Sequence, residues 1–309
     1  MQVLPLSTKF CCTSSEAMGF LSRWRLAPLG ITVAALIWSH AYSPSQAQPT
    51  ATPAAQEQLN QGLALIQQGE AAAAMAAFQR AAELDPNLAA AHYNIGLLLR
   101  QQNDLQAAAD AFWQAVRLDP QFAMAYANLG AALIEGNNAE QAESYLLRAI
   151  EIQPDLSNAH YNLGMAYRLQ ERYEDAIAAL QQAAALNATA PEPHFQTGLI
   201  YLIQQHYADA EGAFRRALEV QPQYPQAHYN LGIALVNQGQ SEAALDAFRA
   251  ATNLSSNYAD AYYSAGLILI QLERYDDARA VLEYAKNLYI TQRNPQWASN
   301  TQAQLDRIP

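Results

Sequence analysis

The sequence predicts an all-α fold in which seven helix-turn-helix repeats of 34 residues stack into a solenoid. One phrase of nine residues recurs at 68-residue intervals, as AHYNIGLLL at 91–99, AHYNLGMAY at 159–167 and AHYNLGIAL at 227–235. Its glycine recurs at half that interval without insertion, at Gly62, Gly96, Gly130, Gly164, Gly198, Gly232 and Gly266. A fixed period of this length is the signature of a repeat architecture.

Two further small residues and one large apolar residue keep their place in every repeat. With the glycine at position 8, the repeats span residues 55–88, 89–122, 123–156, 157–190, 191–224, 225–258 and 259–292. Positions 20 and 27 are alanine in all seven repeats, and position 24 is phenylalanine or leucine. Because glycine within a helix costs about 1 kcal/mol relative to alanine, we expect position 8 to mark a close approach between the backbones of the paired helices.

Proline, which stops a helix, stands at position 32 of four repeats, and Ala188, Ser256 and Ile290 replace it in the others. This order of small, large apolar and small residues followed by proline resembles the tetratricopeptide repeat family. The resemblance covers residues 55–292 and implies a right-handed superhelical solenoid whose first helices line a concave wall. Position 4, usually tryptophan in that family, is here glutamine, histidine or tyrosine.

Connections and the C-terminal segment complete the predicted solenoid. Turns between paired helices are expected at Gln-Gly-Glu (68–70), Gly-Asn-Asn (136–138) and Gln-Gly-Gln (238–240). Residues 293–309 begin with a helix-start signal, Asn294-Pro295. One face of this segment then carries Trp297, Thr301, Leu305 and Ile308. We expect a capping helix that covers the last repeat.

The N-terminal residues 1–47 have the pattern of a secretory signal. An apolar run, Leu26 to Trp38, follows two arginines and precedes the small-x-small sequence Ser-Gln-Ala at 45–47. We expect cleavage after Ala47, a short lead-in at 48–54, and a periplasmic or extracellular product. Initiation at Met18 would give the signal a more ordinary length. The alternative is an uncleaved membrane anchor in which the apolar run extends further.

Composition and spacing argue against several classes of function. The net charge is −11, and the 17 lysines and arginines are scattered along the chain, so the basic stripe that nucleic-acid binding requires is missing. Position 4 carries four histidines, which we interpret as packing residues because stacked helices lie too far apart for equivalent side chains to share one metal ion. These residues are His92, His160, His194 and His228. We find no catalytic spacing in the repeats and expect neither enzymatic activity nor a cofactor.

A series of amides at position 6 is the best candidate for a binding site. The asparagines are Asn60, Asn94, Asn128, Asn162 and Asn230. The series resembles the asparagine ladder in the repeats of O-linked N-acetylglucosamine transferases, which implies contact with a partner's backbone. An amide offers both a donor and an acceptor, so it can pair with the main chain of an extended peptide of any sequence. The alternative is that these asparagines cap or bridge neighbouring helices.

Aromatic and basic residues lie beside the amides. Position 5 carries Tyr93, Tyr161, Phe195, Tyr229 and Tyr263, which suit either a binding surface or packing between repeats. Arg100 and Arg168 share position 12, where they would face the same wall and meet a partner's carboxylate. The lysines of the family's chaperone-binding clamp are missing at positions 2 and 5.

The sequence therefore predicts an exported scaffold that binds an extended protein or peptide segment in its concave groove. Two alternatives stay open: a membrane-anchored assembly factor, distinguished by an uncleaved signal, and a targeting subunit that serves an enzyme in trans.

Overall fold

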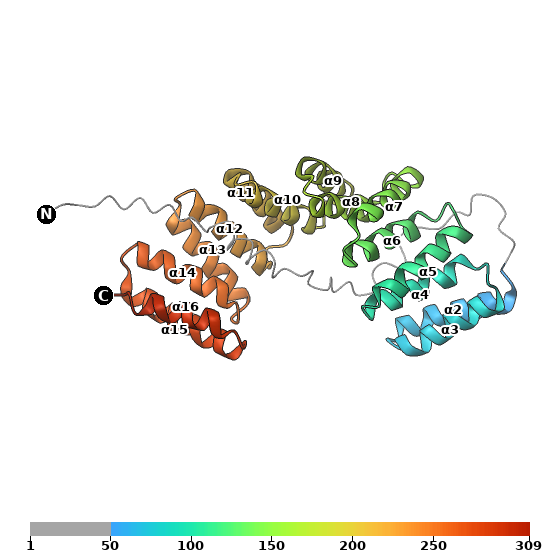
Figure 1. The fold of residues 1–309 in the computed structure, drawn as a ribbon, viewed down its shortest axis with the longest axis horizontal. Coiled ribbons are helices and arrows are strands. Elements are labelled where there is room, and N and C mark those ends of the chain that lie inside the picture. Colours follow the sequence, from blue (N-terminus) through green and yellow to red (C-terminus); the bar gives the residue numbers. More distant parts are fainter. Residues whose placement is uncertain (1–50) are drawn as a thin grey trace. The chain divides into compact units, whose positions relative to one another are not determined.

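The computed structural model describes residues 51–309, and this part of the chain is all-helical, without strands, which confirms the predicted fold class (Figure 1). The predicted signal, residues 1–47, lies outside the described residues. The helices are α2 (Pro53–Gln67), α3 (Ala71–Leu84), α4 (Ala89–Gln101), α5 (Leu105–Leu118), α6 (Ala123–Glu135), α7 (Ala139–Ile152), α8 (Ser157–Leu169), α9 (Tyr173–Leu186), α10 (Glu192–Ile203), α11 (Tyr207–Val220), α12 (Pro225–Asn237), α13 (Ser241–Leu254), α14 (Ala259–Gln271), α15 (Tyr275–Thr291) and α16 (Pro295–Leu305).

The helices form two compact units, one that ends at Glu171 and one that runs from Arg172 to Pro309. The boundary falls in the fourth repeat, between α8 and α9. In the first unit, α2, α4 and α6 each pack against the following helix, and α4, α6 and α8 each pack against the preceding one. The second unit repeats this scheme, with α10, α12 and α14 as the first helices of their pairs and α16 packed on α15.

The recurring glycine at position 8 makes room for the side chain at position 24 of the paired helix. A Cβ built on Gly96 would lie 2.7 Å from two ring atoms of Phe112, and one on Gly232 would lie 2.5 Å from the ring of Phe248. The close approach expected at this position therefore exists, but the approaching group is a large side chain rather than the partner's backbone. The alanines at positions 20 and 27 are fully buried in every repeat, so a larger side chain there would clash with its neighbours.

Each turn between paired helices contains one residue with left-handed backbone at position 15. These residues are Gly69, Asn103, Asn137, Glu171, Gln205, Gly239 and Glu273, with φ between 58° and 80°. The flanking hydrogen bonds are those of a Schellman motif, as where Gly69 N donates to Ile66 O and Glu70 N donates to Leu65 O. In the predicted Gly-Asn-Asn turn the left-handed residue is Asn137, not the glycine beside it.

Glycine at position 15 is expected to stabilise the repeats that lack it. A left-handed residue with a Cβ costs roughly 1–2 kcal/mol, which exceeds the roughly 0.5–1 kcal/mol of added chain entropy that glycine carries. Gln205→Gly and Glu273→Gly should each raise the free energy of unfolding by about 0.5–1 kcal/mol in urea titrations. Gly239→Ala is the reverse control and should lower it, whereas stabilisation by Gly239→Ala would contradict the assignment.

The chain ends its helices at position 30 even where proline is missing from position 32. Ala188 and Ser256 replace proline, yet α9 and α13 still end at Leu186 and Leu254. Only α15, which has Ile290 in that place, continues to Thr291. Proline therefore reinforces an end that packing already sets in most repeats.

Helix α16 covers the apolar end of the last repeat. It begins at Pro295, and the Asn294 side chain accepts a hydrogen bond from Trp297 N at 3.4 Å. Tyr289, 1% exposed, stacks on Trp297 with ring centroids 5.9 Å apart and donates to Asp260 Oδ1 at 2.6 Å. Burial and the nearby Asp260 carboxylate raise the pKa of Tyr289, so the hydroxyl keeps its proton and remains a donor.

At the other end, α2 starts two residues earlier than expected. The predicted lead-in reaches residue 54, but the helix begins at Pro53. The Thr52 side chain caps it by accepting from Ala55 N at 3.3 Å, and proline suits the first helical position.

Each unit contains one tryptophan among the described residues. Trp113 on α5 is 41% exposed, and the guanidinium carbon of Arg117 lies 5.0 Å from its ring centroid. Trp297 on α16 is half-buried between Tyr289 and Tyr263, whose ring centroid is 5.4 Å away.

Candidate functional site

The predicted binding residues lie on the first helices of the repeats, and we call positions 2, 6 and 9 of these helices the first-helix face. In the first unit this face belongs to α2, α4, α6 and α8, and in the second unit to α10, α12 and α14. Its position-9 side chains are apolar, and most of them are half-buried: Leu63, Leu97, Leu199, Ile233 and Leu267. Each unit therefore presents apolar side chains beside the amides.

The asparagine amides use their donor within their own helix. In three of them Nδ2 donates to the carbonyl oxygen four residues earlier, namely Asn94 to Ala90 (2.7 Å), Asn128 to Met124 (2.9 Å) and Asn230 to Gln226 (2.8 Å). This bond turns Oδ1 away from the helix backbone. Asn94 is half-buried, and its Oδ1 has no hydrogen bond among residues 51–309. The amide is therefore an available acceptor, not the combined donor and acceptor that the sequence predicts.

Asn128 also bridges two repeats. Its Nδ2 donates to Tyr93 Oη at 3.2 Å, and its Oδ1 accepts from Nη1 of Arg100 at 3.4 Å. Arg100 in turn donates from Nε to both carboxylate oxygens of Glu135, at 3.1 Å each. The Arg100 and Glu135 side chains are only 17% and 25% exposed. Bridging, one of the two predicted alternatives for position 6, thus occurs at Asn128, whereas Asn94 carries an acceptor without a hydrogen bond.

The pairing with Glu135 corrects the expectation for Arg100. Its guanidinium already has a carboxylate partner within the chain, so an acidic partner would have to displace Glu135. Arg168, at the equivalent position of the fourth repeat, is half-buried and also interacts within the protein. Neither arginine is free to receive a partner's carboxylate in this structure.

Position 5 packs within its own repeat instead of lining an open surface. Phe195 lies with its ring centroid 5.8 Å from Phe214 and 4.9 Å from Tyr224, the last residue of the same repeat. Tyr229 makes the same contacts with Phe248 at 5.7 Å and Tyr258 at 5.0 Å. Phe195 and Tyr229 are 5% and 4% exposed, so they offer almost no surface to a partner. Their assignment to the binding surface is corrected to core packing.

Tyr93 follows the same scheme, with ring centroids 5.8 Å from Phe112 and 4.8 Å from Phe122. Burial raises the pKa of Tyr93 to about 12, against the opposing charge of Arg100, so its hydroxyl stays protonated. Tyr161 is half-buried and interacts within the protein, and Tyr263 packs on Trp297.

The remaining amides differ in exposure. Asn60 is exposed and accepts from Gln56 Nε2 at 3.0 Å, and Asn162 is half-buried. Asn230 is 7% exposed and so contributes less surface than Asn94.

Two acceptors on the first-helix face escaped the sequence analysis. Asn158 Oδ1 at position 2 of α8 and Gln196 Oε1 at position 6 of α10 are buried and have no hydrogen-bond partner within the described residues. Each lies in a different unit. A buried acceptor without a donor is costly, but both oxygens are covered by protein, so an outside donor could reach them only after neighbouring side chains moved. The sequence signal was weak because Gln196 departs from the asparagine series.

The histidines at position 4 fill the role of packing and helix-end residues. In three repeats Nε2 lies within hydrogen-bond distance of the carbonyl oxygen of the proline six residues earlier, pairing His92 with Pro86 (3.3 Å), His160 with Pro154 (2.9 Å) and His228 with Pro222 (3.0 Å). Over residues 51–309, His, Cys, Asp and Glu side chains nowhere gather in the threes that a metal ion would need. No helix in the same range has the length and hydropathy to cross a membrane.

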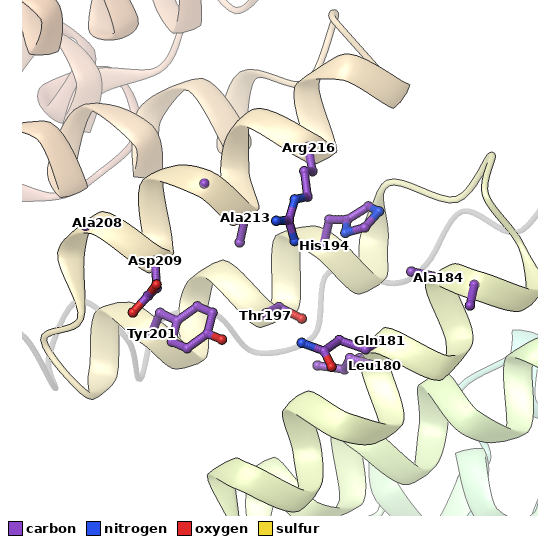
Figure 2. A pocket seen from close by; sticks show the side chains of 12 residues that line it. Leu180, Gln181, Ala184, His194, Thr197, Tyr201, Ala208, Asp209, Ala213 and Arg216 are labelled. Carbon is purple, nitrogen blue, oxygen red and sulfur yellow. The ribbon is translucent and has the colours of Figure 1, made fainter.

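The second unit also contains a cavity that the sequence analysis missed. It has a volume of about 440 Å³ and lies between α9, α10 and α11 (Figure 2). Its lining residues include Gln181, Ala184, His194, Thr197, Tyr201, Asp209, Gly212 and Arg216. These residues occupy positions of α10 other than those of the first-helix face.

Comparisons with known proteins agree with the fold. The chain is similar to the structure described as YrrB, a TPR protein with an unusual peptide-binding site, at 25% identity and a TM-score of 0.52, over 63% of this chain and 99% of that one. It is also similar in fold to pilF of Pseudomonas aeruginosa, at 20% identity and a TM-score of 0.58, over 66% and 92% of the two chains. A comparison with curated proteins finds no match.

Family models give the same result along the chain. Tetratricopeptide repeat models match residues 89–122, 123–156, 157–189, 195–257 and 231–295, and a TPR repeat model matches residues 62–102. The matches cover most of the described residues and recur with the repeats. The chain therefore belongs to the tetratricopeptide repeat family.

Proposed function

We propose that this protein is an exported, non-catalytic scaffold that holds an extended polypeptide segment along the first-helix faces of its repeats. The observation that carries the proposal is the orientation of the position-6 amides. Because Nδ2 is held by the helix carbonyl four residues earlier, an amide such as that of Asn94 presents only Oδ1. That oxygen suits a backbone N–H, which every residue of a partner except proline provides.

The spacing of the amides fits an extended chain. The first helices of successive repeats α4 and α6 touch, and packed helices have axes about 8–10 Å apart. An extended chain advances about 3.3 Å per residue, so one amide would meet roughly every third residue of the partner. The apolar position-9 side chains would cover the partner's side chains, and main-chain pairing would make binding tolerant of sequence.

Relatives support the same class of function. Proteins of this family generally act as scaffolds without catalysis of their own. The similar structure described as having a peptide-binding site shows that a related array can take a peptide.

Paired substitutions distinguish binding from a structural role. In the Asn94→Ala/Asn162→Ala variant each lost hydrogen bond should cost roughly 0.5–1.5 kcal/mol, which weakens binding by about 5-fold to 150-fold. Asn94→Asp/Asn162→Asp keeps an acceptor oxygen at both positions and loses the donor that Asn94 gives to its helix, so binding should persist. The measurement is titration of a linear peptide selected against the wild-type chain from a displayed library, with circular dichroism to verify folding.

A binding role and a purely structural role of the asparagines predict different affinities for these variants. If the asparagines serve only the helix, the aspartate variant should be as impaired as the alanine variant. Wild-type affinity in the alanine variant would remove the first-helix face as the site of binding.

Export is tested separately. We expect the exported protein to start at Gln48, because Ala47 ends the small-x-small sequence after a short apolar run. N-terminal sequencing of the exported protein checks this. Retention of Arg25 to Trp38 would favour the membrane-anchored alternative.

A further inference from the structure

The cavity between α9, α10 and α11 exists because three side chains are smaller than their counterparts in neighbouring repeats. Ala184 stands at position 28, where the adjacent repeats have Ile150 and Leu218. Thr197 stands at position 7, where the adjacent repeats have Leu163 and Leu231. Gly212 stands at position 22, and a Cβ built on it would meet nothing within 4 Å. The change at all three positions opens one space of about 440 Å³, within the range of small-ligand sites.

Polar side chains point into this space, and the charged ones form no ion pair with other described residues. Figure 2 shows Arg216 reaching toward His194 from α11, with the Tyr201 hydroxyl and the Gln181 amide at the other side of the opening. Arg216 makes no ion pair with any described residue, whereas its neighbour Arg215 pairs with Glu211 at 2.9 Å. A guanidinium that lines a pocket and has no carboxylate partner can bind an anion.

His194 also departs from its equivalents. The other position-4 histidines contact a proline carbonyl, but Ala188 replaces that proline before His194, and His194 lines the cavity instead. Burial and the charge of Arg216 lower its pKa, against the opposing charge of Glu219. His194 is therefore neutral near pH 7 and adds a hydrogen-bonding group but no second positive charge. The site thus has one cation, which matches a single carboxylate better than a multiply charged phosphate.

A negative charge, that of Asp209, lies on the same helix as Arg216. Asp209 and Arg216 are seven residues apart on α11, which places them on one face about 10 Å apart along the axis. Both line the cavity, and Asp209 has no hydrogen bond or ion pair with another described residue. A ligand that fills the space would meet a cation at one end and a carboxylate at the other.

We propose that this cavity binds a small zwitterion of the free dipeptide class, with the ligand's carboxylate at Arg216 and its amino group at Asp209. Gln181, Thr197, Tyr201 and His194 supply hydrogen-bonding groups between the two ends. The site shares no residue with the first-helix face, so it is independent of the scaffold function proposed above.

Calorimetric titration of the full chain with dialanine tests the proposal. Dialanine should bind once per chain, and blocking either end, as in N-acetyl-dialanine or dialanine amide, should weaken binding at least tenfold. Arg216→Gln and Asp209→Asn should each do the same. Arg215→Gln changes the neighbouring arginine outside the cavity and should bind as wild type.

Ala184→Ile is the filling variant. It introduces the residue that the preceding repeat carries, so it should fold and abolish dialanine binding. Circular dichroism verifies the fold of each variant. No binding by folded wild-type protein at millimolar dialanine, or unchanged binding by Ala184→Ile and Arg216→Gln, would overturn the proposal. Equal binding of the capped dipeptides would overturn the zwitterionic assignment.

Discussion

Replacing Phe112 with alanine is expected to lower the free energy of unfolding by about 3–5 kcal/mol, the cost of deleting a fully buried aromatic ring. The ring is 0% exposed, packs on Tyr93 and fills the space left by Gly96. Chemical denaturation measures the loss, and the same substitution at exposed Trp113 should cost much less.

Gly96→Ala should lower the free energy of unfolding in the wild-type chain but raise it in the Phe112→Ala chain. In the wild type an added Cβ would lie 2.7 Å from the Phe112 ring, and overpacking of this kind costs roughly 1–3 kcal/mol. That cost outweighs the gain of about 1 kcal/mol that alanine brings in helix propensity. Without the Phe112 ring the clash disappears, and Gly96→Ala should stabilise the chain.

A control for the propensity term is available on α11. Gly212→Ala adds a Cβ that meets nothing within 4 Å, so it should stabilise the otherwise unchanged chain. If Gly96→Ala lowers stability equally with and without Phe112, then the glycine at position 8 is not explained by the side chain at position 24.

Removal of α16 is expected to have the second large effect. A chain that ends at Arg293 would expose Tyr289 and Tyr263, and burying a large side chain contributes roughly 1.5–3 kcal/mol. The loss should therefore reach about 3–6 kcal/mol in urea titrations, and it should fall first on the last repeat because repeats are stabilised by their neighbours.

Trp297→Ala separates packing from chain length in this experiment. It leaves α16 in place but removes the ring that stacks on Tyr289, so it should reproduce part of the loss. Gln296→Ala, at the exposed neighbouring position, should have little effect. Unchanged stability in both the truncated chain and Trp297→Ala would show that α16 does not cover the last repeat.

The helical repeats were predictable because their determinants are local and periodic. Glycine at position 8 and alanine at positions 20 and 27 recur at one phase, so seven copies of a weak signal add up. The left-handed residue at position 15 was not predictable in the same way, because Gly and Asn, the types that favour this conformation, occupy it in only four of the seven repeats. At Gln205 and Glu273 the hydrogen bonds of the helix end impose a conformation that the residue itself does not favour.

The candidate site was harder to predict because its residues lie at the border between surface and core. Burial at positions 5 and 6 varies from repeat to repeat: Tyr93 and Asn94 are both half-buried on α4, whereas Tyr229 and Asn230 are both buried on α12. Position 5 is covered by rings from position 24 and from the last position of the same repeat, contacts that form only when the chain folds back on itself. Arg100 was misassigned for a different reason, since its partner Glu135 belongs to the next repeat.

The placement of one tryptophan in each unit gives the protein a built-in pair of optical probes. A chain that starts at Gln48 contains only Trp113 and Trp297, because Trp24 and Trp38 belong to the predicted signal. Emission from a Trp297→Phe chain would then follow the environment of α5, and emission from a Trp113→Phe chain would follow that of α16. Whether the two halves of the array melt together or in sequence can thus be read without any attached dye.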